Sequence, residues 1–288
     1  MDKPSFDTRF FALPEEFSCC ITSVYRVEIR LPGDREFSDA LQPELANVRI
    51  MRGSLPVSRI GDGPVLAGAD CYVSGPTSHP AHFTMGSARL WGIGIKPCGW
   101  ARMARAPADD AANLLFDGRE QRIFPGLGAL TDAMLAAPPD DEREFGLIAE
   151  WLASLASDPP DLRTVKAVQQ ALLDPAIKTV EQLADASATH VRSLERVCRK
   201  HFGFPPKLLL RRQRLMRVLA DYLVKGATCW TEVMDPQYTD HAQFTREFQH
   251  FMGVSPSEYA RFDLPLMRAF VRQRLADFGS PVQVLDKS

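Results

Sequence analysis

The chain has 288 residues, of which 45% are apolar and 24% are charged, and its formal net charge at pH 7 is −2. This is the composition of a soluble globular protein with one or two domains, so it excludes a disordered chain. No apolar run approaches the ~20 residues that a transmembrane helix needs, so we expect no membrane span and no membrane partner.

The N-terminus and the cysteines indicate the compartment. Met1-Asp2-Lys3 leads into no apolar signal segment. The six cysteines contain no C-x-x-C pair, and the adjacent Cys19 and Cys20 are sterically awkward to bridge. We therefore expect a cytoplasmic protein with reduced thiols.

Residues 1–137 are predicted to form a β-rich domain. Strand-forming residues are concentrated at 17–30, 47–51, 65–73 and 88–96, and Gly, Pro and Asp clusters separate these segments. Several short strands with turn signals between them indicate a barrel or a sandwich. In the last segment, Gly92 and Gly94 indicate a bulge or a close backbone approach. Two small helices, at 107–116 and 126–136, are expected to pack on the strands.

Residues 138–160 read as a linker that contains one helix. The linker begins with Pro138-Pro139-Asp140-Asp141-Glu142 and is broken again at residues 158–161. An amphipathic pattern predicts a helix over 145–156, with Phe145, Ile148, Trp151, Leu152 and Leu155 on one face. This apolar stripe either covers the β-rich domain or pairs with the same helix of a second chain. We favour the first interpretation.

Residues 161–262 are predicted to be helical and to contain a helix-turn-helix. After a helix at 162–173, a short helix at 180–186 and a tight Ser187-Ala188-Thr189 turn lead into a helix over 190–202. Apolar residues lie on one side of that last helix. Arg192, Arg196, Arg199 and Lys200 form a basic stripe on the other side. A helix of this kind fits the major groove of DNA, although a basic helix face is most often a solvated surface.

A second unit of similar design follows a long helix at 205–223. A helix over 241–252 places Phe244, Phe248 and Phe251 on one face, and Gly253 ends it as Gly203 ends the first. Residues 161–262 hold 15 Lys and Arg against 11 Asp and Glu, a net charge of +4, which leaves −6 for the rest of the chain. The positive charge is thus concentrated where DNA would lie.

Two segments near the second unit are less regular. Residues 228–238 carry Pro236 and Gln237, so we expect their helix to end early, near Met234, and the second unit to be tilted or weakened. The tail, 263–288, contains an apolar-basic helix ended by Gly279-Ser280-Pro281. We expect it to pack against one of the domains. A DNA-backbone contact through Arg268, Arg272 and Arg274 is the alternative.

The segments LADASATHVRSLERVCRKHFG, RRQRLMRVLADYL and DHAQFTREFQHFMGVSPSEYAR resemble the DNA-binding domain of AraC-type transcription regulators. The segment SGPTSHPAHF…LWGIGIKPCGW resembles the N-terminal domain of one branch of that family. The resemblance implies an α+β chain: a β-rich, cupin-like sensor or oligomerisation domain (1–137), the linker (138–160), a double helix-turn-helix domain (161–262) and the tail (263–288). Where this family has a Gly-aromatic turn before its second recognition helix, this chain has Gln237. The first unit also lacks the usual small polar N-cap, because His190 stands there, and Thr189 is the candidate substitute.

The resemblance also implies a sequence-specific, effector-responsive regulator whose two recognition helices enter successive major grooves. The residues that match the family's base-contacting positions are Arg192, Glu195, Arg196, His241, Ala242, Gln243, Thr245 and Arg246. Phosphate contacts are expected from Arg199, Lys200 and Lys207. The expected partners are double-stranded promoter DNA, an unidentified small-molecule effector, RNA polymerase and a second copy of the chain, with no cofactor.

Two other classes of protein remain as alternatives. An enzyme is disfavoured because the chain has no G-x-S-x-G, no phosphate-binding loop and no H-E-x-x-H motif. His79 and His82 with Cys71 or Cys98 match no closed zinc pattern, so we expect no metal. The second alternative is a degenerate domain that serves protein interaction or small-molecule binding without specific DNA reading, which the Pro236 irregularity motivates.

Overall fold

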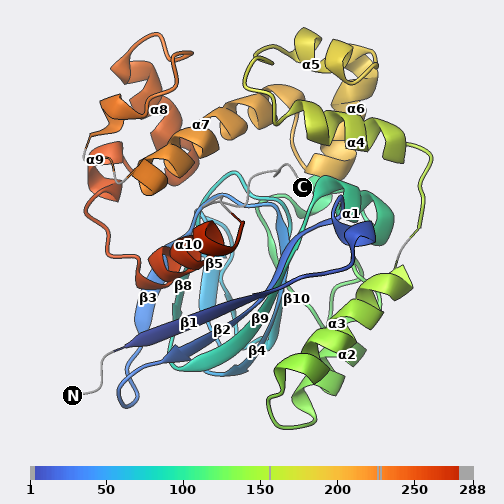
Figure 1. The fold of residues 1–288 in the computed structure, drawn as a ribbon, viewed down its shortest axis with the longest axis vertical. Coiled ribbons are helices and arrows are strands. Elements are labelled where there is room, and N and C mark those ends of the chain that lie inside the picture. The colour runs from blue at the N-terminus through green and yellow to red at the C-terminus, as the bar shows by residue number, and fades with distance from the viewer. Residues whose placement is uncertain (1–3, 156, 226, 228, 279–288) are drawn as a thin grey trace.

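The computed structural model describes residues 4–155, 157–225, 227 and 229–278. Two antiparallel sheets from the N-terminal half lie below a layer of helices from the C-terminal half (Figure 1). The chain is therefore α+β, with a β-rich region first and a helical region after it, as the sequence predicts. None of the helices that the structure describes combines the length and the apolar character that a bilayer crossing demands.

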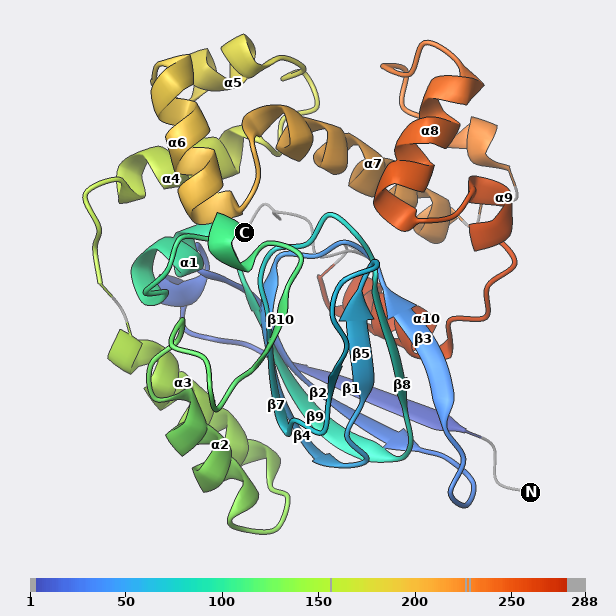
Figure 2. The ribbon, with the colours of Figure 1, turned by 180° about the vertical axis from the view of Figure 1, so that it is seen from behind.

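The two sheets curve around a shared apolar interior. The larger has the order β1-β2-β9-β4-β7-β10 and the smaller has the order β3-β8-β5-β6. The strands are β1 (Ser5–Phe11), β2 (Ile21–Arg30), β3 (Phe37–Leu41), β4 (Ala46–Gly53), β5 (Val57–Ile60), β6 (Leu66–Ala67), β7 (Cys71–Ser74), β8 (Ala81–Met85), β9 (Ala88–Ile95) and β10 (Leu115–Asp117). Figure 2 shows the smaller sheet from the opposite side.

Strand β9 is buried on both faces, and this explains its near-continuous apolar sequence. Leu90 joins the interior between the sheets, whereas Trp91 and Ile93 face the helices outside. A Cβ added at Gly92 would lie 2.0 Å from Cζ of Tyr25. A side chain makes the close approach at Gly92, so the predicted backbone approach is not observed there. The predicted alternative, a bulge, is found at the Gly94 end, where the pairing of β2 with β9 shifts register between Ile21 and Ser23.

The prediction of a helix at 107–116 is wrong. Only one 3₁₀ turn forms there, η2 (Asp109–Ala111), and strand β10 then begins at Leu115. Asn113 adopts a left-handed backbone conformation, with a φ of 59°, which a helix cannot continue. Its side-chain oxygen also accepts a hydrogen bond from the backbone N–H of Ser78 at 2.7 Å, so tertiary contacts fix the loop.

Most of the remaining helices lie within a few residues of the predicted ranges. A turn η1 (Glu15–Phe17) precedes the larger sheet's second strand. The helices are α1 (Pro97–Met103), α2 (Leu127–Leu135), α3 (Asp141–Leu155), α4 (Leu162–Ala171), α5 (Val180–Ala186), α6 (Val191–Phe202), α7 (Pro206–Lys225), α8 (His241–Met252), α9 (Pro256–Tyr259) and α10 (Pro265–Phe278). However, α3 begins four residues before its predicted start, and α1 and α9 were not predicted.

The linker helix α3 covers the outer face of the larger sheet. Ile148 and Leu152 are fully buried against it, and Trp151 is nearly so. This confirms that the apolar stripe packs within its own chain. Such burial of large side chains stabilises the contact by ~1.5–3 kcal/mol each.

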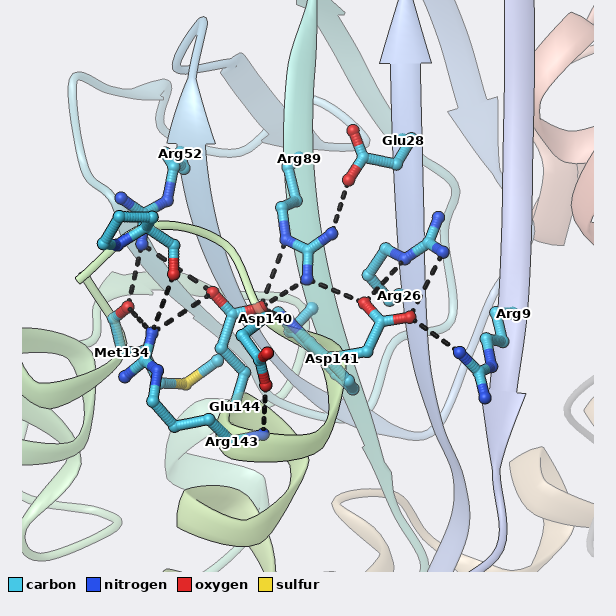
Figure 3. Close-up of polar contacts among 12 residues, drawn as sticks. Arg9, Arg26, Glu28, Arg52, Arg89, Met134, Asp140, Asp141, Arg143 and Glu144 are labelled. Atoms are coloured by element: carbon cyan, nitrogen blue, oxygen red, sulfur yellow. Dashed lines mark hydrogen bonds and ion pairs between the residues drawn. The ribbon is translucent and has the colours of Figure 1, made fainter.

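Charged side chains fix the beginning of α3 on the same sheet (Figure 3). The Asp141 carboxylate accepts hydrogen bonds from Arg9 at 2.9 Å, Arg26 at 3.3 Å and Arg89 at 2.8 Å. The buried Glu144 accepts one from the indole N–H of Trp91 at 2.6 Å and pairs with Arg89. The linker helix is therefore held by a network rather than by an isolated surface pair.

The tail helix α10 packs against β1 and β3, the edge strands of the two sheets, and covers the gap between them (Figure 1). Phe270 contacts the ring of Tyr25, with centroids 4.8 Å apart, and Leu266 joins the interior. The Asp39 carboxylate accepts the backbone N–H groups of Leu266 and Met267 at 2.8 and 3.2 Å, so a strand residue caps this helix. The expectation that the tail packs against a domain is confirmed. Its predicted end at residues 279–281 lies outside the described residues.

Candidate nucleic-acid interface

The first helix-turn-helix begins with a capping box. Thr179 accepts the N–H of Gln182 at 3.2 Å, and Gln182 Oε1 accepts the N–H of Thr179 at 3.2 Å. Helix α5 then turns through Ala188, which has a positive φ of 48°, into α6. The N-cap of α6 is His190, whose side chain makes no capping hydrogen bond. The expected lack of a small polar cap is thus observed, and neighbouring Thr189 does not replace it.

Helix α6 presents its basic stripe away from the core. Arg192 and Arg199 are exposed, and so is Arg196, whose side chain is 64% accessible. Glu195 is half-buried. The opposite face buries Leu194, Val197, Cys198 and Phe202 in the cluster that α6 shares with the larger sheet.

Asp161, just before α4, binds part of this stripe. Its carboxylate contacts Lys200 Nζ and His201 Nε2 at 2.9 Å each, and Arg196 Nη1 at 3.9 Å. Burial would raise the pKa of Asp161, but hydrogen bonds from His201 and Lys200 outweigh it and hold the pKa at about 2. Lys200 is therefore already paired within the chain, whereas Arg192 and Arg199 point outward.

The second recognition helix, α8, starts at the N-cap Asp240, which accepts the N–H of Gln243 at 2.6 Å. Gln243 Oε1 in turn accepts the N–H of Thr239 at 2.8 Å. Bidentate reading of adenine uses both the oxygen and the nitrogen of a Gln amide. In this conformation Gln243 therefore offers only its Nε2 donor. Of the other predicted contacts, His241, Ala242 and Arg246 are exposed and Thr245 is half-buried.

Glu247 joins α8 to the long helix α7. Its buried carboxylate accepts hydrogen bonds from Arg211 Nε at 2.9 Å, Arg214 Nη2 at 2.7 Å and the Tyr238 hydroxyl at 2.8 Å. Arg246 takes no part in this cluster, although it is next to Glu247 in the sequence. The two recognition helices lie at opposite ends of α7 in both views (Figures 1 and 2).

A basic groove of about 820 Å³ separates the two units. We call it the inter-unit groove. Its charged walls are formed by Lys178, Glu181, Lys207, Arg211, Arg214, Arg217, Arg246 and Glu247. Gln237 bridges the units beside it, donating from Nε2 to the carbonyl of Pro175 at 3.2 Å. The groove brings the predicted contacts Lys207, Gln243 and Arg246 together.

Lys178, Arg211 and Arg217 also belong to this surface, although they were not predicted to contact DNA. For Arg211 and Arg217 the sequence carries a signal, because Lys207, Arg211, Arg214 and Arg217 recur at spacings of four, three and three, which is one face of a helix. Of the alternative contacts in the tail, Arg268 and Arg272 are exposed. Arg274 is fully buried and cannot reach DNA.

The expected helix ahead of α8 does not form. Among the described residues of 229–238 only one 3₁₀ turn is present, η3 (Trp230–Glu232). Trp230 stacks on Tyr222 with ring centroids 3.8 Å apart and donates to the carbonyl of Pro256 at 3.1 Å. Aromatic packing therefore replaces helical hydrogen bonding, and the prediction of a helix to about Met234 is wrong.

The histidines and cysteines considered as metal ligands do not converge. Cys71 is buried in the larger sheet and Cys98 in α1, while His79 lies beside His250 of α8, with ring centroids 6.0 Å apart. In the described part of the chain, no group of three or more His, Cys, Asp or Glu side chains is arranged to hold a metal ion.

Comparison with known protein families gives a match within the helical region. The family model of a helix-turn-helix domain matches residues 183–261. No curated protein matches the chain.

Among solved structures, ToxT from Vibrio cholerae with a bound unsaturated fatty acid is 10% identical, with a TM-score of 0.42, over 90% of this chain and 97% of that one. ToxT with a bound naphthalenyl-butenoic acid is 12% identical, with a TM-score of 0.44, over 89% and 98%. The AraC-like transcriptional activator CuxR is 14% identical, with a TM-score of 0.30, over 79% and 90%.

Proposed function

From the AraC-type helix-turn-helix domain that residues 183–261 form, we propose that the chain is a sequence-specific, DNA-binding regulator of transcription. The observation that carries the proposal is the placement of two exposed helices, α6 and α8, at opposite ends of α7, beside a basic groove that lies between residues 177–181 of the first unit and α8. Basic side chains on a concave surface neutralise phosphates and release counterions, which supplies affinity. Side chains on the recognition helices supply sequence preference.

The geometry of α7 supports binding to two successive major grooves. Helix α7 has 20 residues, so it is about 30 Å long at ~1.5 Å per residue. One turn of DNA is about 34 Å. A single chain would then place α6 and α8 about one turn apart, as dimeric helix-turn-helix proteins do.

Base contacts are assigned to Arg192, Glu195 and Arg196 on α6, and to His241, Ala242, Gln243, Thr245 and Arg246 on α8. Phosphate contacts are assigned to Arg199, Lys200 and Lys207, to which the inter-unit groove adds Lys178 and Arg217. Arg can read guanine bidentately and Glu can accept from cytosine, and each good contact discriminates by roughly 1–3 kcal/mol. Lys200 has to leave Asp161 to reach a phosphate.

The effector is assigned to the interior of the sheets. A cavity of about 100 Å³ lies there under α10, lined by apolar side chains and by the buried Arg49–Glu44 pair. An apolar cavity of about 150 Å³ holds benzene. An effector of metabolite size therefore fits only if Phe270 and its neighbours on α10 move. Because α10 follows the second unit in the chain, this movement would transmit effector binding to that unit.

The proposal is tested by fluorescence anisotropy of the full chain on duplex from the region upstream of its own gene, against scrambled duplex. Preference for one sequence with a steep negative slope of log affinity against log salt supports it. Absence of binding to any duplex at low salt overturns it.

An interaction module remains the second candidate function, because residues 229–238 lack the α-helix that normally precedes a second recognition helix. The anisotropy assay distinguishes the two functions. A module without DNA reading binds both duplexes equally at every salt concentration.

A further inference from the structure

A small cavity lies where the larger sheet, the first helix-turn-helix and α7 meet. Its volume is about 30 Å³, which is room for about two water molecules by the usual criterion. Its lining includes Ile95 from the sheet, His201 from α6, and Arg212 and Met216 from α7. The cavity therefore lies between the proposed sensor region and the proposed DNA reader.

Arg212 brings a positive charge to this cavity without a counterion. Its side chain is only 6% exposed, and its Nε–H has no hydrogen-bond partner. No Asp or Glu oxygen among the described residues pairs with its guanidinium. The nearest acidic influence is Glu44, whose carboxylate is bound by Arg49 at 2.7 Å. Burying an unpaired charge is strongly unfavourable, so a native chain retains one where something compensates it.

A second buried side chain with an unpartnered atom lines the same cavity. His201 is 4% exposed, and its Nε2 bonds the Asp161 carboxylate at 2.9 Å. Its Nδ1 has no partner. Two buried polar side chains, from two different helices, thus leave hydrogen-bonding atoms unused at one small cavity.

We propose that this cavity binds a small monovalent anion of the size of chloride, held by Arg212 and His201. Water would fill the volume and satisfy the hydrogen bonds, but it would leave the charge of Arg212 uncompensated. The volume excludes large anions such as gluconate. The bound anion would link α6, α7 and the sheet, and this role is independent of whether the chain reads DNA.

The anion should bind together with a proton. A neutral imidazole that donates Nε2–H to Asp161 offers only an acceptor at Nδ1, and protonation turns Nδ1 into a donor to the anion. Burial now lowers the pKa of His201, aided by nearby cations. The charged groups that act on this site are Asp161, Lys200 and Arg196 around His201, Glu44 near Arg212, and Lys96 and Arg212 in the lining. An anion beside Nδ1 favours the protonated ring.

Thermal unfolding of the full chain in sodium chloride and in sodium gluconate, at one ionic strength, tests the site. Chloride at ten times its Kd should raise the folded-to-unfolded ratio about elevenfold. The shift in melting temperature should be larger at pH 6 than at pH 8. Arg212→Met should abolish it, whereas Arg163→Met, at an exposed position of α4, should leave it intact.

Equal melting temperatures in the two salts would contradict the proposal, as would the same chloride effect in Arg212→Met. If that variant does not fold, anomalous diffraction from a crystal of the unaltered chain grown in bromide shows whether an anion occupies the cavity. An anomalous peak beside Arg212 supports the site, and a water molecule in its place refutes it.

Discussion

Asp161 forms ion pairs with two side chains that were predicted from the sequence to contact DNA, Arg196 and Lys200. It lies 39 residues from Lys200 and 40 from His201 in the chain. Periodicity predicts that Arg192 and Arg199 are exposed, and the structure confirms it. Periodicity cannot reveal that Lys200 is paired, because its partner comes from another helix.

The pairing gives a pH prediction. The pKa of Asp161 is lowered from 3.8 to about 2, so its contribution is present above pH 3.8 and is lost as pH falls through about 2. Asp161→Asn should lower the free energy of unfolding by about 2 kcal/mol at pH 7, and by little near pH 2. Urea unfolding at both pH values measures it. The exposed Asp158→Asn is the control, and an equal loss at both pH values would contradict the pKa assignment.

Substitutions of Arg196 and Arg217 should distinguish contacts to bases, which give sequence preference, from contacts to phosphates, which give affinity for any sequence. Arg196→Ala should reduce the preference for the cognate sequence by roughly 1–3 kcal/mol. Arg217→Ala, in the inter-unit groove, should weaken all sequences alike and reduce the salt slope by about one. Anisotropy on both duplexes across a salt series distinguishes the two. If Arg196→Ala leaves the specificity ratio unchanged, α6 is not the reader.

At the scale of elements, the helices with a strong period were predicted well, and the segments decided by tertiary contacts were not. Apolar spacing predicts α5, α6 and α8. In addition, α5 begins at the capping residue Thr179, α6 ends at Gly203, and α8 has both a capping Asp240 and a terminal Gly253. The failures at 107–116 and 229–238 have the same physical reason. Asn113 and Trp230 are fixed by partners distant in the sequence, and these contacts override local helix propensity.

The join between α7 and α8 depends on Glu247. Glu247→Gln removes the counterion of the partly buried Arg211 and Arg214. Breaking a buried pair typically destabilises by ~3–5 kcal/mol, so we expect a loss in that range and faster hydrogen exchange in α8. Denaturant unfolding with exchange mass spectrometry measures both, with the exposed Glu232→Gln as control. Unchanged exchange in α8 would rule out this role.

At the scale of the molecule, both ends of the helical region pack against the sheets. The sheets share a core with the first unit, α7 leads to the second unit, and α10 returns to the sheets. The apolar pattern of the tail predicts that it packs on a domain. It cannot say which domain, because Tyr25 and Asp39 come together only when the sheets have formed.

Weakening the contact between α10 and the sheets should therefore make the cavity between the sheets more accessible. Phe270→Glu should increase binding of the apolar fluorophore N-phenyl-1-naphthylamine to the full chain, since the charge cannot remain beside Tyr25. Ala276→Glu, at an exposed position of the same helix, should not. Fluorescence titration measures both, and equal binding by the two variants would show that α10 does not close the cavity.

We propose that α6 and α8 read two successive major grooves. Selection of duplexes from a random pool by the full chain, followed by sequencing, is the sharpest test. We expect an enriched site with two conserved segments about 10 base pairs apart, with Arg192→Ala relaxing one segment and Arg246→Ala the other. A pool that stays random after selection, or one enriched segment that neither variant alters, would contradict it.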